Sequence, residues 1–130
     1  MKIGEVIQSA DWKAEKHVPV IDAPATAQSN EAFDINLQVG AEIPHPNTTE
    51  HHIRWIKLYF KPNDGKFVYE LASFEFHAHG ESVKGANSGP AHIEPIARCR
   101  AKLAESGTLI CVAYCNIHGL WENSQEIAVS

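Results

Sequence analysis

The sequence predicts an all-β fold, an antiparallel β-sandwich preceded by a short helical segment near the N-terminus. Short segments in which apolar and polar residues alternate recur along the chain, and clusters of Gly, Pro, Asn, Asp and Ser separate them. The chain has 130 residues, which is the usual length of a single domain. We therefore expect residues 1–130 to form one domain around one hydrophobic core.

The N-terminal residues follow a helical rather than a strand pattern. Ile3, Val6, Ile7 and Ala10 stand at positions i, i+3, i+4 and i+7, which is the spacing of one face of an amphipathic helix. A short helix is therefore expected within residues 2–14.

Further along the chain the hydrophobic pattern has a period of two. Its clearest segment is residues 33–39, where Phe33, Ile35, Leu37 and Val39 alternate with polar residues. The seven expected strands are residues 17–21, 33–39, 52–60, 67–76, 91–104, 108–116 and 126–129. The main loops and turns expected between them are residues 22–30, 44–47, 62–65, 80–90 and 106–107. Seven short strands separated by turns are typical of an immunoglobulin-like sandwich.

Composition and charge exclude several classes of function. The chain is 44% hydrophobic and 21% charged, which is ordinary for a soluble globular protein. With 11 basic and 16 acidic residues the net charge is −5, so a nucleic-acid-binding face is not expected. No apolar run approaches the roughly 20 residues of a membrane helix, and the N-terminus lacks the apolar core of a signal peptide. Three cysteines, Cys99, Cys111 and Cys115, cannot all pair within one chain, so we expect a reducing, cytoplasmic location and no membrane partner.

Histidine is the one residue type in unusual excess, with 8 in the chain. Most of the histidines fall in three clusters beside turn-forming residues at the ends of expected strands. The ends of strands are where a rigid sandwich presents functional groups. The clusters are residues 15–20 (Glu-Lys-His-Val-Pro-Val), 45–52 (His-Pro-Asn-Thr-Thr-Glu-His-His) and 114–122 (Tyr-Cys-Asn-Ile-His-Gly-Leu-Trp-Glu).

The third cluster predicts a metal site. Cys115 and His118 are separated by two residues around a turn, so one metal ion can bind both. His45 and His51 offer imidazoles across a loop, and His17 offers a further one. One thiolate with four imidazoles exceeds the four ligands of structural zinc and favours an iron with one open position.

These motifs resemble those of superoxide reductases of the neelaredoxin type. The resemblance is carried by residues 15–19, 45–52, 78–82 and 115–119 and extends over essentially the whole chain. It implies a mononuclear iron at one end of an immunoglobulin-like sandwich, and the one-electron reduction of superoxide to hydrogen peroxide. Some relatives carry an additional four-cysteine iron domain, for which this chain has too few cysteines, so the resemblance is to the one-iron form.

The resemblance also implies roles for seven residues and for two kinds of partner. The four equatorial imidazole ligands would be His17, His45, His51 and His118. Cys115 would be the axial thiolate ligand. Glu15 and Lys16 would be the catalytic residues: Glu15 would bind the sixth position of the oxidised iron and leave on reduction, and Lys16 would sit beside the open position. A rubredoxin-like donor would return the electron, and the chain would form a homotetramer.

Two other functions stay open at this point. A cupredoxin-like electron-transfer module also places cysteine near histidine on a β-sandwich, although the only methionine, Met1, lies far from the third cluster in sequence. A non-enzymatic immunoglobulin-like interaction domain would carry its histidines incidentally and bind no metal. Cys99 and Cys111 are interpreted as small buried apolar residues, and His77 and His79 as structural.

Overall fold

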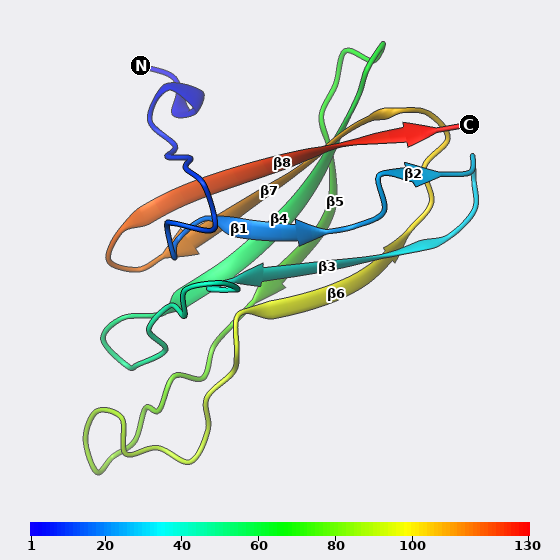
Figure 1. Cartoon of the computed structure of the whole chain (residues 1–130). Helices are drawn as coiled ribbons and strands as arrows, with labels where there is room; N and C mark the ends of the chain where they lie inside the picture. Colours follow the sequence, from blue (N-terminus) through cyan, green and yellow to red (C-terminus); the bar gives the residue numbers. More distant parts are fainter.

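Two β-sheets packed face to face form the molecule, as the alternation of apolar and polar residues predicts (Figure 1). The computed structural model describes all residues of the chain, 1–130. Its elements are η1 (Ile3–Glu5), β1 (Pro19–Asp22), β2 (Thr26–Ala27), β3 (Phe33–Val39), β4 (Ile53–Pro62), β5 (Tyr69–Glu75), β6 (Ile96–Ala101), β7 (Gly107–Cys115) and β8 (Gly119–Val129). The predicted all-β sandwich is confirmed.

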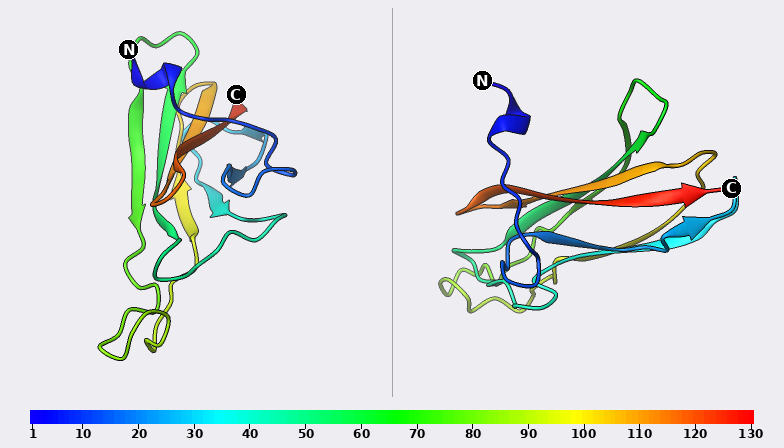
Figure 2. Two further views of the ribbon diagram at one scale, coloured as in Figure 1. Left: turned by 90° about the vertical axis from the view of Figure 1, so that its left-hand side faces the viewer. Right: turned by 45° about the horizontal axis from the view of Figure 1, so that its top comes forward.

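The two sheets differ in size. One has three strands in the order β1-β3-β6, and the other has five in the order β2-β8-β7-β4-β5. Paired strands run antiparallel, with the exception of the short β2, which pairs parallel with the end of β8. Figures 1 and 2 show the two layers, with β1 and β3 on one side and β7 and β8 on the other.

The core between the sheets consists of inward-facing side chains at alternate strand positions. Ile35 and Leu37 of β3 belong to the same buried cluster as Ile56 and Leu58 of β4. All four are fully buried, and so is Leu109 of β7. Burial of these large apolar side chains is the main force that holds the two sheets together.

Where the sequence pattern is strong, the strands lie where it predicts them. Strand β3 covers the predicted residues 33–39, because its inward side chains are all apolar. The predicted extent of β8 is wrong. The strand begins at Gly119, whereas the sequence predicts a strand only over residues 126–129. Trp121 and Ile127 are its only buried side chains, so its polar middle carries no period-two signal.

The N-terminal region also differs from the prediction. The helix expected within residues 2–14 is reduced to the single 3-10 turn η1, because Ile3 and Val6 stay 65% and 54% exposed and their burial contributes little to a longer helix. The loop expected at residues 22–30 contains β2, which adds an eighth strand to the seven expected. No helix of the chain is long and apolar enough to cross a membrane.

Most of the strands begin or end at one end of the sandwich, toward the left in Figure 1. Strands β1, β4, β6 and β8 begin there, and β3, β5 and β7 end there. The pairings Pro19 with Val39 and Ile53 with Cys115 hold these strand ends in register. Each of the three histidine clusters therefore continues from a strand at this end of the molecule.

We expect replacement of Leu58 by Ala to lower the free energy of unfolding by about 2–5 kcal/mol, because it leaves a cavity in a close-packed core. Urea denaturation followed by circular dichroism measures the change. Val83→Ala is the control, since Val83 is fully exposed and its truncation should change the free energy by no more than about 0.5 kcal/mol. Similar losses in the two variants would contradict the position of Leu58 in the core.

Candidate metal centre

The strand ends bring together histidines and a cysteine that lie far apart in sequence. His17 stands two residues before β1, and Cys115 is the last residue of β7. His45 and His51 lie in the connection between β3 and β4, and His118 lies in the turn between β7 and β8. The antiparallel pairing of Ile53 with Cys115 holds the 40–52 connection next to the turn that follows Cys115.

Five potential donor atoms gather at one point. The ligand atoms of His17, His45, His51 and Cys115 all lie within 4.8 Å of one another. His118 joins them through Nδ1, which lies 3.1 Å from Nε2 of His17, 3.2 Å from Nε2 of His51 and 3.8 Å from Sγ of Cys115. The structure thus brings together the four histidines and the cysteine that were predicted as ligands, whereas Glu15, the sixth predicted ligand, contacts the outer nitrogen of His17.

Hydrogen bonds on the outer side of two imidazoles orient their inner nitrogens. Nδ1 of His45 donates to the carbonyl oxygen of Pro46 at 2.6 Å, and Nδ1 of His17 donates to Oε1 of Glu15 at 2.6 Å. Because these acceptors require a proton on Nδ1, each ring keeps a lone pair on Nε2 when it is neutral. This is the tautomer in which histidine binds a metal through Nε2.

One of these nitrogens shows that the site fits a cation. Nε2 of His45 is buried and has no hydrogen-bond partner in the protein. A buried polar atom without a partner is costly, so such an atom calls for an explanation. A metal ion accepts this lone pair, together with the other four donors around it.

Burial also keeps these rings neutral. It lowers the pKa of His45 to about 4, and the positive charges of His17, His51 and Lys16 act in the same direction. Burial, followed by the charge of His118, lowers the pKa of His51 as well. Neutral imidazole is the form that binds a metal, so the environment favours ligand-competent rings near neutral pH.

Cys115 is the one cysteine at this site. Its side chain is buried, and its Sγ accepts a hydrogen bond from the main-chain N–H of His118 at 3.4 Å. Such a bond stabilises a thiolate and tunes its donation to a metal. Cys99 and Cys111 are free thiols elsewhere in the sandwich, and burial raises the pKa of Cys111 to about 12.

Glu15 and Lys16 lie at the edge of the cluster rather than inside it. The Glu15 carboxylate accepts hydrogen bonds from the ring and the main-chain N–H of His17, and the ring bond is the main cause that lowers its pKa. Lys16 is half-buried, and its charge contributes to the lowered pKa of Glu15, His45 and His51. The sixth-position role expected for Glu15 stays a prediction, since its carboxylate here contacts the outer nitrogen of His17.

The remaining buried histidines have a structural arrangement of their own. His52 and His79 stack with ring centroids 3.5 Å apart and planes inclined by 9°. Nδ1 of His52 donates to the carbonyl oxygen of Thr48 at 2.8 Å, which turns the ring away from the neighbouring His51. His77 is exposed and pairs with Glu75. Glu81 pairs with Nδ1 of His79 at 3.5 Å, but the stacked rings do not belong to a cluster of three or more potential metal ligands.

Two asparagines that support the site were not predicted from the sequence. Asn116 and Asn87 both hydrogen-bond to the residues around His51. Asparagine is common in turns because its side chain bonds to nearby main-chain groups. That general tendency was the only sequence signal, and it does not indicate which distant segment the amide contacts.

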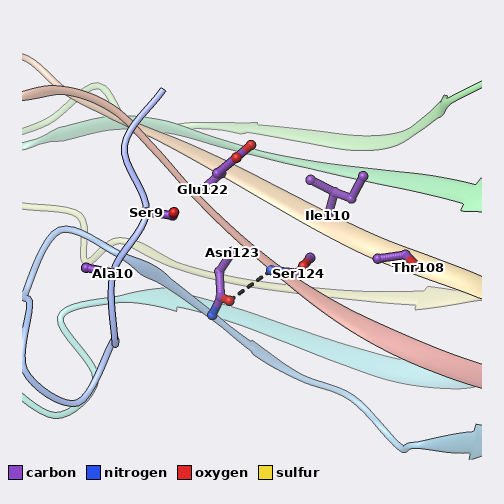
Figure 3. A pocket seen from close by; sticks show the side chains of 7 residues that line it. All are labelled: Ser9, Ala10, Thr108, Ile110, Glu122, Asn123 and Ser124. Atoms are coloured by element: carbon purple, nitrogen blue, oxygen red, sulfur yellow. Dashed lines mark hydrogen bonds between the residues drawn. The ribbon is translucent and has the colours of Figure 1, made fainter. Parts of the chain in front are cut away.

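A hollow of about 460 Å³ lies on the five-stranded sheet, and the proposed ligands do not line it (Figure 3). The residues that line it are Ser9, Ala10, Thr108, Ile110, Glu122, Asn123 and Ser124. The side-chain oxygen of Asn123 accepts a hydrogen bond from the main-chain N–H of Ser124 at 2.9 Å. Glu122 is the only titratable side chain among them, so this hollow has no set of metal donors.

Known proteins are similar to this chain in sequence and in fold. A model of the desulfoferrodoxin family matches residues 9–124. The neelaredoxin of Megalodesulfovibrio gigas is 49% identical over 129 residues, which covers 99% of each protein. The superoxide reductase of Pyrococcus furiosus is 54% identical over 121 residues, 93% of this chain and 95% of that protein. A solved structure of a relative from Thermotoga maritima is 55% identical, with a TM-score of 0.97 over 100% of this chain and 98% of that one.

The raised pKa of Cys111 predicts that this thiol is unreactive in the folded protein. Because the thiolate is the nucleophile, iodoacetamide at about pH 8 should leave Cys111 unmodified and should modify it once guanidinium unfolds the chain. Peptide mass mapping measures the extent of modification. Labelling of Cys111 in the folded protein as fast as in the unfolded chain would contradict its burial.

Proposed function

The chain belongs to the desulfoferrodoxin family, and we propose that residues 1–130 form one superoxide reductase domain of the one-iron type. The protein is a superoxide reductase with one mononuclear iron: superoxide takes up one electron and two protons and leaves as hydrogen peroxide. The observation that carries this conclusion is the convergence of four histidines and one cysteine at one end of the sandwich.

The donor set favours iron over the metals of the alternative readings. The five proposed ligands are His17, His45, His51, His118 and Cys115. Structural zinc takes four ligands, and blue copper takes two histidines, a cysteine and usually an axial methionine. Met1, the only methionine, is fully exposed and does not belong to the cluster of donors. The structure therefore does not favour a cupredoxin-like copper site. An interaction domain with incidental histidines does not explain why donor atoms from distant segments converge at one point.

Bound ferrous iron supplies the single electron for the reduction of superoxide. The chain's own residues prepare the site for it. Cys115 contributes a negatively charged sulfur, which favours the higher oxidation state of a metal bound to it. The main-chain N–H of His118 moderates that charge through its hydrogen bond to Sγ. Glu15 and the Pro46 carbonyl hold the rings of His17 and His45 in place.

Glu15 would be a further ligand of the iron in its oxidised state, as the resemblance implies. Its place two residues before His17 supports this role, because its carboxylate lies beside the ring of a proposed ligand. The side chain is about a third exposed, which leaves it room to move. In the present arrangement the carboxylate accepts hydrogen bonds from the ring and the main-chain N–H of His17.

Lys16 is proposed to attract superoxide to the open position. The substrate is an anion and the chain carries a net charge of −5, so any attraction must be local. Lys16 is close enough to His45 and His51 to act on their titration. A positive charge at the rim of the site raises the local concentration of an anionic substrate.

The remaining partners follow from the single metal site. The chain has one cluster of potential metal ligands. The electron that returns the iron to the ferrous state must therefore come from another molecule, and a rubredoxin-like protein is the proposed donor. Three free cysteines support a reducing, cytoplasmic location. Phe67, Val68 and Tyr69 are more than half exposed, and such apolar surface supports the homotetramer that the resemblance implies.

Replacement of Cys115 by Ser tests the proposed site. The wild-type protein should take up one iron per chain and gain a thiolate-to-iron absorption band on oxidation. The variant should lose that band and its superoxide reductase activity, because oxygen replaces the sulfur donor. Cys111→Ala is the matched control, since Cys111 is equally buried in the same strand, and it should keep both. An unchanged band in Cys115→Ser would refute Cys115 as a ligand.

Replacement of Lys16 by Ala tests the attraction of the anion. The rate constant for superoxide at low ionic strength should fall by about threefold to tenfold, with a weaker dependence on salt. Pulse radiolysis measures the rate. Lys13→Ala changes the net charge equally at an exposed position and should have little effect. Equal losses in both variants would show that overall charge, rather than Lys16, sets the rate.

A further inference from the structure

A single side chain links the two segments that carry most of the proposed ligands. Asn116 lies between Cys115 and His118, in the turn that follows β7. Its Nδ2 donates to the carbonyl oxygen of Glu50 at 2.8 Å, and its Oδ1 accepts from the main-chain N–H of His52 at 2.9 Å. Its own main-chain N–H donates to the carbonyl oxygen of His52 at 3.2 Å. These three bonds contact the chain on both sides of His51.

The position of Asn116 explains why a side chain is needed here. The ladder between β4 and β7 has an irregularity between Ile53 and Trp55 and reaches its last pair at Ile53 and Cys115. Beyond that pair the two chains separate into the 40–52 connection and the β7–β8 turn. The amide of Asn116 continues the cross-link past the last pair, because it offers one donor and one acceptor to main-chain groups.

The second asparagine near His51 acts on one segment only. Oδ1 of Asn87 accepts from the main-chain N–H of Thr49 at 2.8 Å, and its Nδ2 donates to the carboxylate of Glu50. Asn87 therefore ties the 40–52 connection to the loop at residues 80–90. It makes no hydrogen bond to Cys115 or His118. Among the side-chain amides, the link between the ligand-bearing segments depends on Asn116.

We propose that Asn116 is a positioning residue for the metal centre, which holds the His51 ring at its distance from His118 and Cys115. The proposal rests on the ligand set of the proposed function. Nε2 of His51 and Nδ1 of His118 lie 3.2 Å apart although 67 residues separate them in sequence. Donors from two chain segments form one site only when their separation is held to within about 0.5 Å. Loss of an outer-shell partner of this kind typically weakens metal binding about 10–100-fold.

Cobalt(II) titration of the metal-free protein tests this role without relying on activity. Asn116→Ala removes both side-chain bonds, and Asn116→Leu removes them but keeps the approximate shape of the side chain. Both variants should bind Co²⁺ about 10–100-fold more weakly than the wild type, with shifted ligand-field bands. Gln125→Ala is the matched control, because Nε2 of Gln125 also donates to a distant main-chain carbonyl, that of Ala23, at 3.0 Å. It should leave the Co²⁺ affinity within about twofold of the wild type.

Each outcome of this experiment is decisive. Wild-type affinity in Asn116→Leu would overturn the proposal, because it would show that the volume of the side chain and not its hydrogen bonds matters. An equal loss in Gln125→Ala would also overturn it, since general destabilisation would then explain the effect. Circular dichroism of each metal-free variant identifies any that fail to fold. If Asn116→Ala fails to fold, Asn116→Leu still tests the role of the hydrogen bonds. If the wild type itself shows no thiolate-to-cobalt band, the ligand set is wrong and the proposed function fails rather than this inference alone.

Discussion

The antiparallel pairing of β4 with β7 is the constraint on which the metal centre depends. It runs from Pro62 opposite Gly107 to Ile53 opposite Cys115. Side chains in a strand alternate between the two faces, so a shift of one residue would move Cys115 from the buried face to the outer one. The apolar residues of both strands, fully buried at Ile56, Leu58 and Leu109, make such a shift costly. The core therefore determines the position of the Cys115 sulfur.

At this end of the molecule, close packing conflicts with the hydration that polar side chains need. Packing removes His45 and Cys115 from water, which favours neutral rings and disfavours any isolated charge. A cation shared by five donors resolves that conflict, because each lone pair then has a partner. The chain as a whole carries a net charge of −5, and Lys16 is the permanently positive side chain that lowers the pKa of His45 and His51. In the proposed role of Lys16, an anionic substrate would meet this positive charge at the rim of the site.

The sequence predicts the parts of this structure whose residues act through simple patterns. Strand β3 alternates without interruption and lies where expected, whereas β8 has only Trp121 and Ile127 buried and was recognised only near its end. The helical spacing of Ile3 and Val6 predicts a helix longer than η1, because periodicity does not reveal how much of the apolar face is buried in the folded chain. The ligands could be named from their residue types and from family motifs. The contact of Glu15 with His17 and the cross-link by Asn116 could not, since hydrogen-bond partners depend on the three-dimensional path of the chain.

The exposed position of His118 has a consequence for how the centre exchanges electrons. Its ring lies 3.1 Å from a nitrogen of His17 at the centre, yet the residue itself is open to solvent. A reductant that collides with this end of the molecule would therefore meet a proposed ligand at the surface. In that case it would need no buried conduit, and discrimination among reductants would rest on the shape and charge of the surface residues around His118. Exchange of those residues would alter the choice of reductant while the core and the donor set stay the same.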